Sequence, residues 1–275
     1  MTSKVSIIIP CYNDDEYIEQ AVQSALDQTY ENKEIIVVDD GSNQKTKAVL
    51  KKLETKITLL ITQENKGTSA ARNTGIAAAT GEYILVLDSD DYFEPEFCEK
   101  AIGIFEKDSN IKMVTCYARW FWNHKDFQIF IPAGGGLKNF LITNSSLGTI
   151  FCKKNWKEVG GYDEKMIKGF EDWEFYIRLH KNGGRTEVIP MVLFHYRKKK
   201  KSRTTLANEN KYELLEYIYL KHADLYKENF ELFTKNLLNK IKIEEREIIK
   251  NTERIDFKLG KSILRPLRFF KSLIS

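Results

Sequence analysis

The 275-residue sequence contains no apolar run of the roughly 20 residues that a membrane-spanning helix needs. The first apolar run, Val5–Ile9, is too short for the hydrophobic region of a secretory signal, and no small-residue cleavage site follows it. We therefore expect a cytoplasmic protein.

Cysteine is scarce, and its spacing argues against a zinc site. The four cysteines lie far apart and match no metal-ligand spacing. Three of the four stand in apolar surroundings, which is typical of small residues in a hydrophobic core. The four are Cys11, Cys98, Cys116 and Cys152.

Charge of one sign is not in large excess, so a nucleic-acid-binding protein is not expected. The net charge is +4, and the hydrophobic (42%) and charged (30%) fractions are those of a soluble globular protein. The basic residues are nevertheless concentrated at Arg197–Arg203 and Lys258–Lys271. Such patches favour an anionic ligand or an anionic surface as partner.

The first half of the chain alternates apolar strands with amphipathic helices. This alternation predicts an α/β fold with a mostly parallel sheet flanked by helices on both faces. Asn13 and Asp14 are candidate caps for the first helix. The expected strands are Val5–Ile9, Glu34–Val38, Ile57–Thr62 and Tyr83–Leu87, and the expected helices are Asp14–Gln28, Gly41–Leu53, Thr68–Ala79 and Glu94–Glu106.

Polar clusters follow three of these strands: Cys11–Asn13, Asp39–Ser42 and Asp88–Asp91. Ligands of open parallel sheets bind beyond the carboxyl ends of the strands, so the three clusters predict a single site. The last cluster holds three carboxylates within four residues, and their mutual repulsion requires water, a cation or a basic partner. Hard divalent cations prefer such oxygen ligands, which indicates a metal–diphosphate site. The alternative is a solvated aspartate-rich turn.

The second half of the chain is less regular until residue 204, and helical periodicity dominates beyond it. We predict an α/β domain at residues 1–204 and a helical region at residues 205–275. The residues from 255 to 275 form a basic amphipathic segment. Such a segment can lie on an anionic membrane surface, as at the inner face of the cell membrane. Packing on the protein's own body or on another subunit, in a homo-oligomer, is the alternative.

Five motifs, taken in order over about the first 200 residues, resemble those of the family 2 glycosyltransferases. The resemblance implies a GT-A fold, a nucleotide-sugar donor, a divalent metal (Mn²⁺ or Mg²⁺) and inversion at the anomeric carbon. The motifs are Val5–Asn13, Ile36–Ser42, Asn65–Gly67 with Ala70–Asn73, Asp88–Asp91 and Glu171–Trp173.

For the nucleotide, the resemblance places the acid at the Asp40 position against the base, which is usually uracil, so a UDP-linked donor is favoured. Either Asp39 or Asp40 is expected to cap the following helix while the other contacts the base. Arg72 is expected to hold a diphosphate oxygen or to pair with an acid of the site. The full set of candidate nucleotide-binding residues is Pro10, Tyr12, Asn13, Asp39, Asp40, Asn65, Lys66, Arg72, Asp88 and Ser89.

For the chemistry, the resemblance implies that Asp90 binds the metal directly and that Asp88 lies near the ribose or the metal. Direct displacement also needs a proton acceptor beside the incoming hydroxyl. We expect Asp172 to be this base, with Glu171 orienting it or binding the acceptor. The alternative for both acids is to complement the dipole of a helix start. Trp173 is expected either to stack on a sugar ring or simply to pack.

The segment His195–Arg197 followed by Ser202 resembles a late element of the family, but the intervening loop Lys198–Lys201 is all lysine where many relatives carry a histidine. Arg197 and Lys199 are candidates to close over the diphosphate. A solvated charge run is the alternative. His195 is as compatible with a core histidine as with a ligand.

Together these features predict a hexosyltransferase-type enzyme that transfers one sugar to the hydroxyl of a glycan, lipid-linked or protein acceptor, in cell-surface polysaccharide or glycoconjugate synthesis. Arg119-Trp120 lacks the glutamine of the element found in processive synthases. A nucleotidyltransferase is an alternative, but Pro10–Asp14 lacks its basic, glycine-rich loop. A non-catalytic assembly protein is a third possibility, which the presence of all the acids disfavours.

Overall fold

The computed structural model describes residues 3–123, 125–199, 202–254, 257 and 259. The chain divides into two compact units, Met1–Leu225 and Tyr226–Ser275. Residues 205–225 thus belong with the sheet, whereas the sequence predicts a boundary after residue 204. The two units are described separately.

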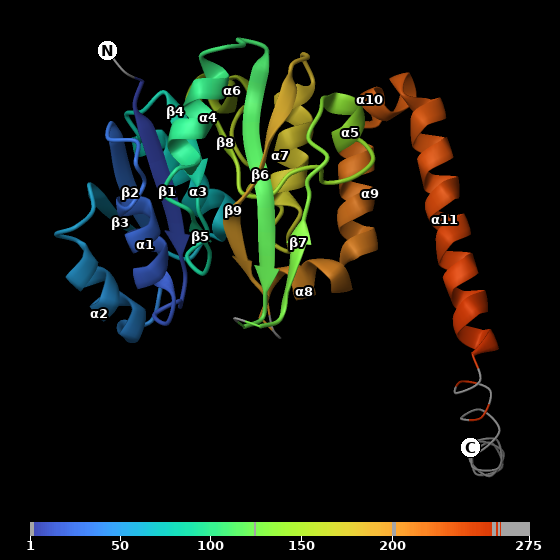
Figure 1. Ribbon diagram of the computed structural model, residues 1–275, viewed down its shortest axis with the longest axis horizontal. Helices are drawn as coiled ribbons and strands as arrows, with labels where there is room; N and C mark the ends of the chain where they lie inside the picture. The colour runs from blue at the N-terminus through green and yellow to red at the C-terminus, as the bar shows by residue number, and fades with distance from the viewer. Residues whose placement is uncertain (1–2, 124, 200–201, 255–256, 258, 260–275) are drawn as a thin grey trace. The chain divides into compact units, whose positions relative to one another are not determined.

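The first unit contains the whole sheet, whose strand order is β3-β2-β1-β4-β8-β6-β9-β5, with β7 paired to β6 (Figure 1). The strands are β1 (Val5–Cys11), β2 (Lys33–Asp40), β3 (Leu59–Gln63), β4 (Tyr83–Val86), β5 (Tyr92–Phe93), β6 (Ile111–Phe121), β7 (Phe127–Phe130), β8 (Ile150–Cys152) and β9 (Arg185–Arg197). The helices of this unit are α1 (Ile18–Leu26), α2 (Gln44–Leu53), α3 (Thr68–Ala78), α4 (Phe97–Phe105), α5 (Leu137–Phe140), α6 (Lys153–Val159), α7 (Glu171–His180), α8 (Arg203–Glu209) and α9 (Lys211–Lys221).

The predicted α/β class is confirmed. Strands β3, β2, β1 and β4 run parallel, as their apolar sequences predict, and β8 then joins β4 in the antiparallel direction. Beyond β8 the sheet is mixed, since β6 and β9 are parallel to each other while β5 and β7 are antiparallel to their neighbours.

Helices cover both faces of the parallel part, which explains why β1 is buried along its whole length. Alternate residues of a strand point to opposite faces. Ile7 and Ile9 share a hydrophobic core with α1 and α4, whereas Ile8 faces α3. A Cβ atom on Gly75 of α3 would lie 2.5 Å from the Ile8 side chain, so only glycine permits this close approach.

The first residues and the caps of helices α1 and α2 differ from those predicted by the sequence. The prediction that Asn13 or Asp14 caps the first helix is wrong, because α1 begins at Ile18 and the Tyr17 side chain makes no capping bond. The alternative cap roles of Asp39 and Asp40 are also wrong. Asn43 caps α2, where its side chain accepts a hydrogen bond from the Thr46 amide.

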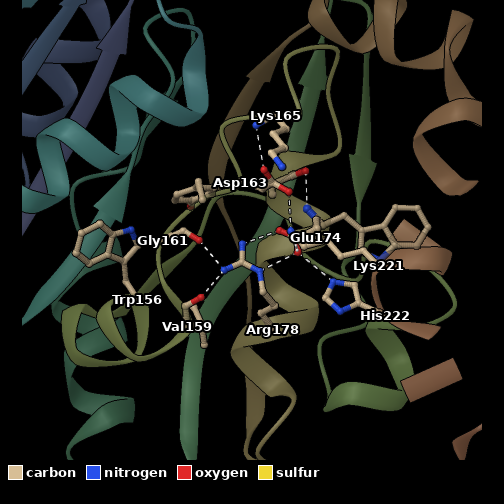
Figure 2. Close-up of polar contacts among 12 residues, drawn as sticks. Trp156, Val159, Gly161, Asp163, Lys165, Glu174, Arg178, Lys221 and His222 are labelled. Carbon is tan, nitrogen blue, oxygen red and sulfur yellow. Dashed lines mark hydrogen bonds and ion pairs between the residues drawn. The ribbon is translucent and has the colours of Figure 1, made fainter. Parts of the chain in front are cut away.

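A buried polar cluster joins α7 to the residues that follow α9. The Glu174 side chain has no exposed surface, and it forms ion pairs with Arg178 (2.6 Å) and Lys221 (2.8 Å) and contacts His222 at 3.0 Å. Figure 2 shows Arg178 between this carboxylate and the carbonyl oxygens of Val159 and Gly161, to which it also donates. The cluster therefore fixes α7 against both the loop after α6 and the end of α9.

The second unit is helical, with α11 at Phe230–Glu253 following α10 (Ala223–Glu228), which crosses the unit boundary. Within the described residues no helix combines the length and the apolar character that spanning a membrane requires. Of the basic amphipathic segment at residues 255–275, all but residues 257 and 259 lie outside the described residues.

We expect Glu174→Gln to lower the free energy of unfolding by about 3 kcal/mol, because it leaves buried cations without their counter-charge. Burial would raise the pKa of Glu174, but hydrogen bonds from His222 and Arg178 outweigh it and hold the pKa well below its ordinary value. The carboxylate therefore stabilises the fold fully above about pH 4.3, and this contribution is lost as the pH falls below that value.

Urea unfolding at pH 7 and pH 4 measures both effects. The matched control is Glu158→Gln, which breaks the exposed pair with Lys154 (3.8 Å) and should cost less than about 0.5 kcal/mol. Equal losses for the two variants would contradict a stabilising role for the buried cluster.

Candidate active site

The carboxyl ends of β1, β2 and β4 meet at one edge of the sheet, and a groove of about 280 Å³ opens there. Cys11 at the end of β1 pairs with Asp39 near the end of β2, so the first two polar clusters lie side by side. The predicted single site is therefore present as a geometric feature. Its lining includes Pro10, Tyr12, Asn13, Asp14, Asp40, Asp88, Ser89, Asp90, Tyr196, Arg197, Lys199, Ser202 and Arg203.

Asp39 and Asp40, at the end of β2, hold the backbone of the loops that follow β2 and β3. Asp39 accepts a hydrogen bond from the Ser42 amide at 2.9 Å. Asp40 accepts from the Gln63 side chain (2.7 Å) and from the amides of Lys66 and Gly67, both at 2.9 Å. A carboxylate offers about four acceptor positions. Asp40 therefore keeps about one for a ligand.

Three other candidate nucleotide-binding residues, Asn13, Asn65 and Lys66, differ in how they lie relative to the groove. Asn65 and Lys66 are exposed and do not line the groove, although the Lys66 amide binds Asp40. Asn13 has a left-handed φ of 54°, and its side chain accepts from the Asn43 amide at 2.7 Å. This places it beside Tyr12 at the rim of the groove.

Arg72 of α3 is buried between two carboxylates. Its guanidinium lies 2.7 Å from Asp88 and 3.0 Å from Glu171. Of the two roles considered for Arg72, pairing with acids is the one present. Burial would raise the pKa of Asp88, but Arg72 outweighs it and holds this pKa below its ordinary value. One cation thus joins the acid at the end of β4 to the start of α7.

Asp172 follows Glu171 in the first turn of α7. Asp172 and Asp88 line a small cavity of about 50 Å³, together with Tyr162 and Tyr196. The Asn144 amide donates to Asp172 at 2.9 Å. Burial, and after it the charge of Glu171, raises the pKa of Asp172 to about 6. A carboxylate with this pKa can accept a proton near neutral pH.

The backbone before Asp172 is strained. Gly169 and Phe170 have φ angles of 125° and 60°, and α7 starts without a side-chain cap. Left-handed backbone at a non-glycine residue costs energy and is concentrated at functional sites. The two turns aim Glu171 and Asp172 toward Arg72 and the small cavity.

Two of the aromatic candidates belong to the core. Trp173 is buried and its indole donates to the Phe140 carbonyl, so of the two roles considered for it, packing is the one present. His195 is buried, stacks on Tyr92 (4.3 Å, 5°) and contacts Glu94 at 2.7 Å. Burial lowers its pKa, so it is a neutral core histidine rather than a groove ligand.

The late basic element reaches the aspartate cluster. The Lys199 ammonium lies 2.8 Å from Asp90 and 3.3 Å from Asp14. The Arg197 amide donates to buried Asp91 at 2.8 Å, and the Arg197 guanidinium donates to the Asp90 carbonyl at 2.9 Å. Arg197 therefore supports the turn while also lining the groove.

The sequence pattern does not predict the place of three side chains at the candidate site. It predicts a helix cap at Asp14, yet the Asp14 carboxylate lines the groove and accepts a hydrogen bond from Ser89 at 2.7 Å. Its position directly after the first polar cluster was an available signal. Asn144 and Tyr162 come from irregular segments, and only their tertiary contacts place them near Asp172.

The acids of the groove offer the oxygen ligands that a hard divalent cation prefers. Asp88 and Asp90 offer oxygen ligands at the end of β4. Among the described residues, no group of three or more histidine, cysteine, aspartate or glutamate side chains has metal-site geometry. Mg²⁺-type sites often use one or two carboxylates and complete their coordination with substrate phosphates, and this arrangement matches the donor set.

We expect Gly169→Ala to destabilise the protein by about 2 kcal/mol, because a Cβ atom there would meet that of Ala207 at 2.5 Å and would strain the left-handed backbone. Gly103→Ala in α4 is the matched control. Its Cβ meets no atom within 4 Å, so this variant should be stabilised by about 0.5 kcal/mol. Urea unfolding compares the two, and similar effects would contradict the strain at Gly169.

This chain is similar in sequence to chondroitin synthase of Pasteurella multocida, with 27% identity over 285 residues. The aligned residues are 96% of this chain and 29% of that protein, so the chain spans under a third of it. A structure of S. aureus TarS (1–349) in complex with UDP-GlcNAc has a TM-score of 0.66 at 24% identity, over 79% of this chain and 66% of that one. The Pyrobaculum calidifontis mannosyltransferase PcManGT, in complex with GDP-Man and Mn²⁺, has a TM-score of 0.64 at 18% identity, over 95% of this chain and 84% of that one.

At these identities the two structures show a shared fold, which is the GT-A fold expected from the sequence. A family model described as the N-terminal domain of galactosyltransferase matches residues 144–202. The model described as glycosyl transferase family 2 matches residues 6–153, more than half of the sequence, and the chain therefore belongs to that family.

Proposed function

We propose that this protein transfers a single sugar, with inversion, from a nucleoside diphosphate donor to an acceptor hydroxyl. The observation that carries the proposal is the cavity shared by Asp88 and Asp172. One acid lies at the edge of the sheet, where the diphosphate is expected, and the other lines the same cavity and would take the proton of the incoming hydroxyl. Arg72 fixes this arrangement by pairing with both Asp88 and Glu171.

In this mechanism Asp172 is the general base. Inverting displacement passes through a transition state with oxocarbenium character and needs a carboxylate on the face opposite the leaving group. A pKa of about 6 keeps Asp172 ionised at neutral pH and still basic enough to accept the proton. Glu171 is held by Arg72 and by Arg203 at 3.1 Å, which suits it to orient the helix start and the acceptor.

The donor would lie along the groove, with its base between Tyr12 and Asp40 and its diphosphate near Asp88 and Asp90. We propose Mn²⁺ or Mg²⁺ as the cofactor, held by these two aspartates. When bound, such a cation supplies Lewis-acid stabilisation of charge on the leaving diphosphate. A UDP-linked donor is favoured, and the UDP-GlcNAc complex of TarS supports this choice.

Cell-surface polysaccharide or glycoconjugate synthesis is the proposed setting, supported by the similarity to chondroitin synthase. The acceptor would be a glycan, a lipid-linked saccharide or a protein. A cytoplasmic location at the inner membrane face, reached through residues 255–275, belongs to the same proposal.

We expect Asp172→Asn to lower the rate of sugar transfer by about 10²- to 10⁴-fold, since the amide cannot accept the proton. Binding of UDP, followed by calorimetry, should stay within about twofold of the original because Asp172 does not line the groove proposed for the nucleotide. In the unaltered enzyme, kcat/KM should fall as the pH drops below about 6, where Asp172 becomes protonated.

Asn144→Ala is the companion variant for this pH profile. The amide stabilises the charged carboxylate, so its removal should move the acidic limb to higher pH. Full turnover by Asp172→Asn, or an acidic limb that stays in place, would remove Asp172 from the proposed role.

A thermal-shift screen identifies the nucleotide. We expect UDP with Mn²⁺ to raise the Tm by about 5 °C or more at saturating concentration, since a ligand bound only to the folded state stabilises it. GDP and CDP under the same conditions are the controls and should give smaller shifts. No shift with any nucleoside diphosphate would count against the proposed donor class.

A further inference from the structure

Each aspartate of the cluster Asp88–Asp91 is paired with a cationic side chain or with a backbone amide. These partners differ in how firmly they are held. Asp88 pairs with the buried guanidinium of Arg72, and Asp91 accepts from the backbone amide of Arg197. Asp90 instead pairs with the side chain of Lys199, 29% of which is exposed. Lys199 is therefore the partner most able to leave its carboxylate.

The backbone beside Lys199 is held by hydrogen bonds that do not depend on its ammonium. The Lys198 amide donates to the Phe121 carbonyl at 2.9 Å, and Arg197 binds the turn and Gln20. The Lys199 stem is a flexible chain of four carbons that carries a compact point charge. Its ammonium can exchange between partners in the groove without movement of the backbone just after β9, where Lys199 lies.

The ammonium occupies the position from which a divalent cation would approach Asp90. It lies 2.8 Å from one Asp90 oxygen and 3.3 Å from Asp14, above the Tyr17 ring at 4.5 Å. Two cations cannot share that oxygen at such distances without strong repulsion. A diphosphate changes the balance, because its oxygens give Lys199 an alternative anionic partner within the same groove.

We infer that Lys199 and a divalent cation compete for the Asp90 carboxylate, so that the cation enters the site together with the nucleoside diphosphate rather than before it. The inference rests on the proposed function, since it assumes the metal-assisted donor site at Asp88 and Asp90. It gives Lys199 a role in the free enzyme. The ammonium neutralises Asp90 in the free enzyme and then transfers to the phosphate oxygens.

Mn²⁺ binding followed by electron paramagnetic resonance, with and without UDP, tests the competition directly. Without nucleotide, Lys199→Gln should bind Mn²⁺ about tenfold more tightly than the original protein, because a like charge next to the ligand is gone. UDP should then strengthen Mn²⁺ binding less in this variant than in the original, and the same reduction should be found when Mn²⁺ is held fixed and UDP is titrated.

Two variants control for charge and position. Lys199→Arg keeps the charge and should therefore bind Mn²⁺ no more tightly than the original protein in the absence of UDP. Lys198→Gln removes a neighbouring charge whose ammonium lies over the rings of Trp120 (4.0 Å) and Tyr196 (4.9 Å), and it should stay within about twofold of the original.

Asp90→Asn separates the failure of this inference from the failure of the proposed function. If Asp90→Asn loses UDP-dependent Mn²⁺ binding while Lys199→Gln behaves like Lys198→Gln, the competition is overturned and the metal site stands. If Asp90→Asn binds Mn²⁺ with UDP as the original does, the proposed metal site itself is wrong.

Discussion

The buried guanidinium of Arg72 is the interaction on which the rest of the site depends. A charge taken out of water is tolerated only when carboxylates and hydrogen bonds compensate it, so Arg72 requires both Asp88 and Glu171 at contact distance. Asp88 follows β4, and Glu171 opens α7, 83 residues later in the chain. By joining them, Arg72 sets the separation between the acids at the sheet edge and the candidate base beside Glu171.

The same pattern of compensation extends across the groove. Carboxylates crowd the edge because three parallel strands end there, and cations from α3, from the segment after β9 and from α8 pair with acids of the site. A site built this way already contains the charges needed to receive a diphosphate. The strained backbone at Gly169 and Phe170 adds the remaining element, a helix start whose acids point inward.

The sequence predicts the parts of this structure that follow from local pattern. Continuous apolar strands predict a parallel sheet, and parallel strands bring the segments after Ile9, Val38 and Leu87 to one edge. The parts that depend on distant contacts were not predictable in this way. Aspartate is a common helix-capping residue, but the Asp14 carboxylate accepts a hydrogen bond from Ser89 instead. Trp173 directly follows the two acids, but its indole donates to the Phe140 carbonyl. The positive φ of Phe170 leaves no signature in its residue type.

The buried carboxylate of Glu174 has a consequence for the order in which the chain can fold during its synthesis. Its partner His222 lies 48 residues further along, beyond the last strand of the sheet. While the ribosome is still producing α8 and α9, Glu174 has Arg178 but lacks Lys221 and His222. The contacts that hold the helix carrying Asp172 are therefore complete only after the chain has been made past the sheet, late in translation.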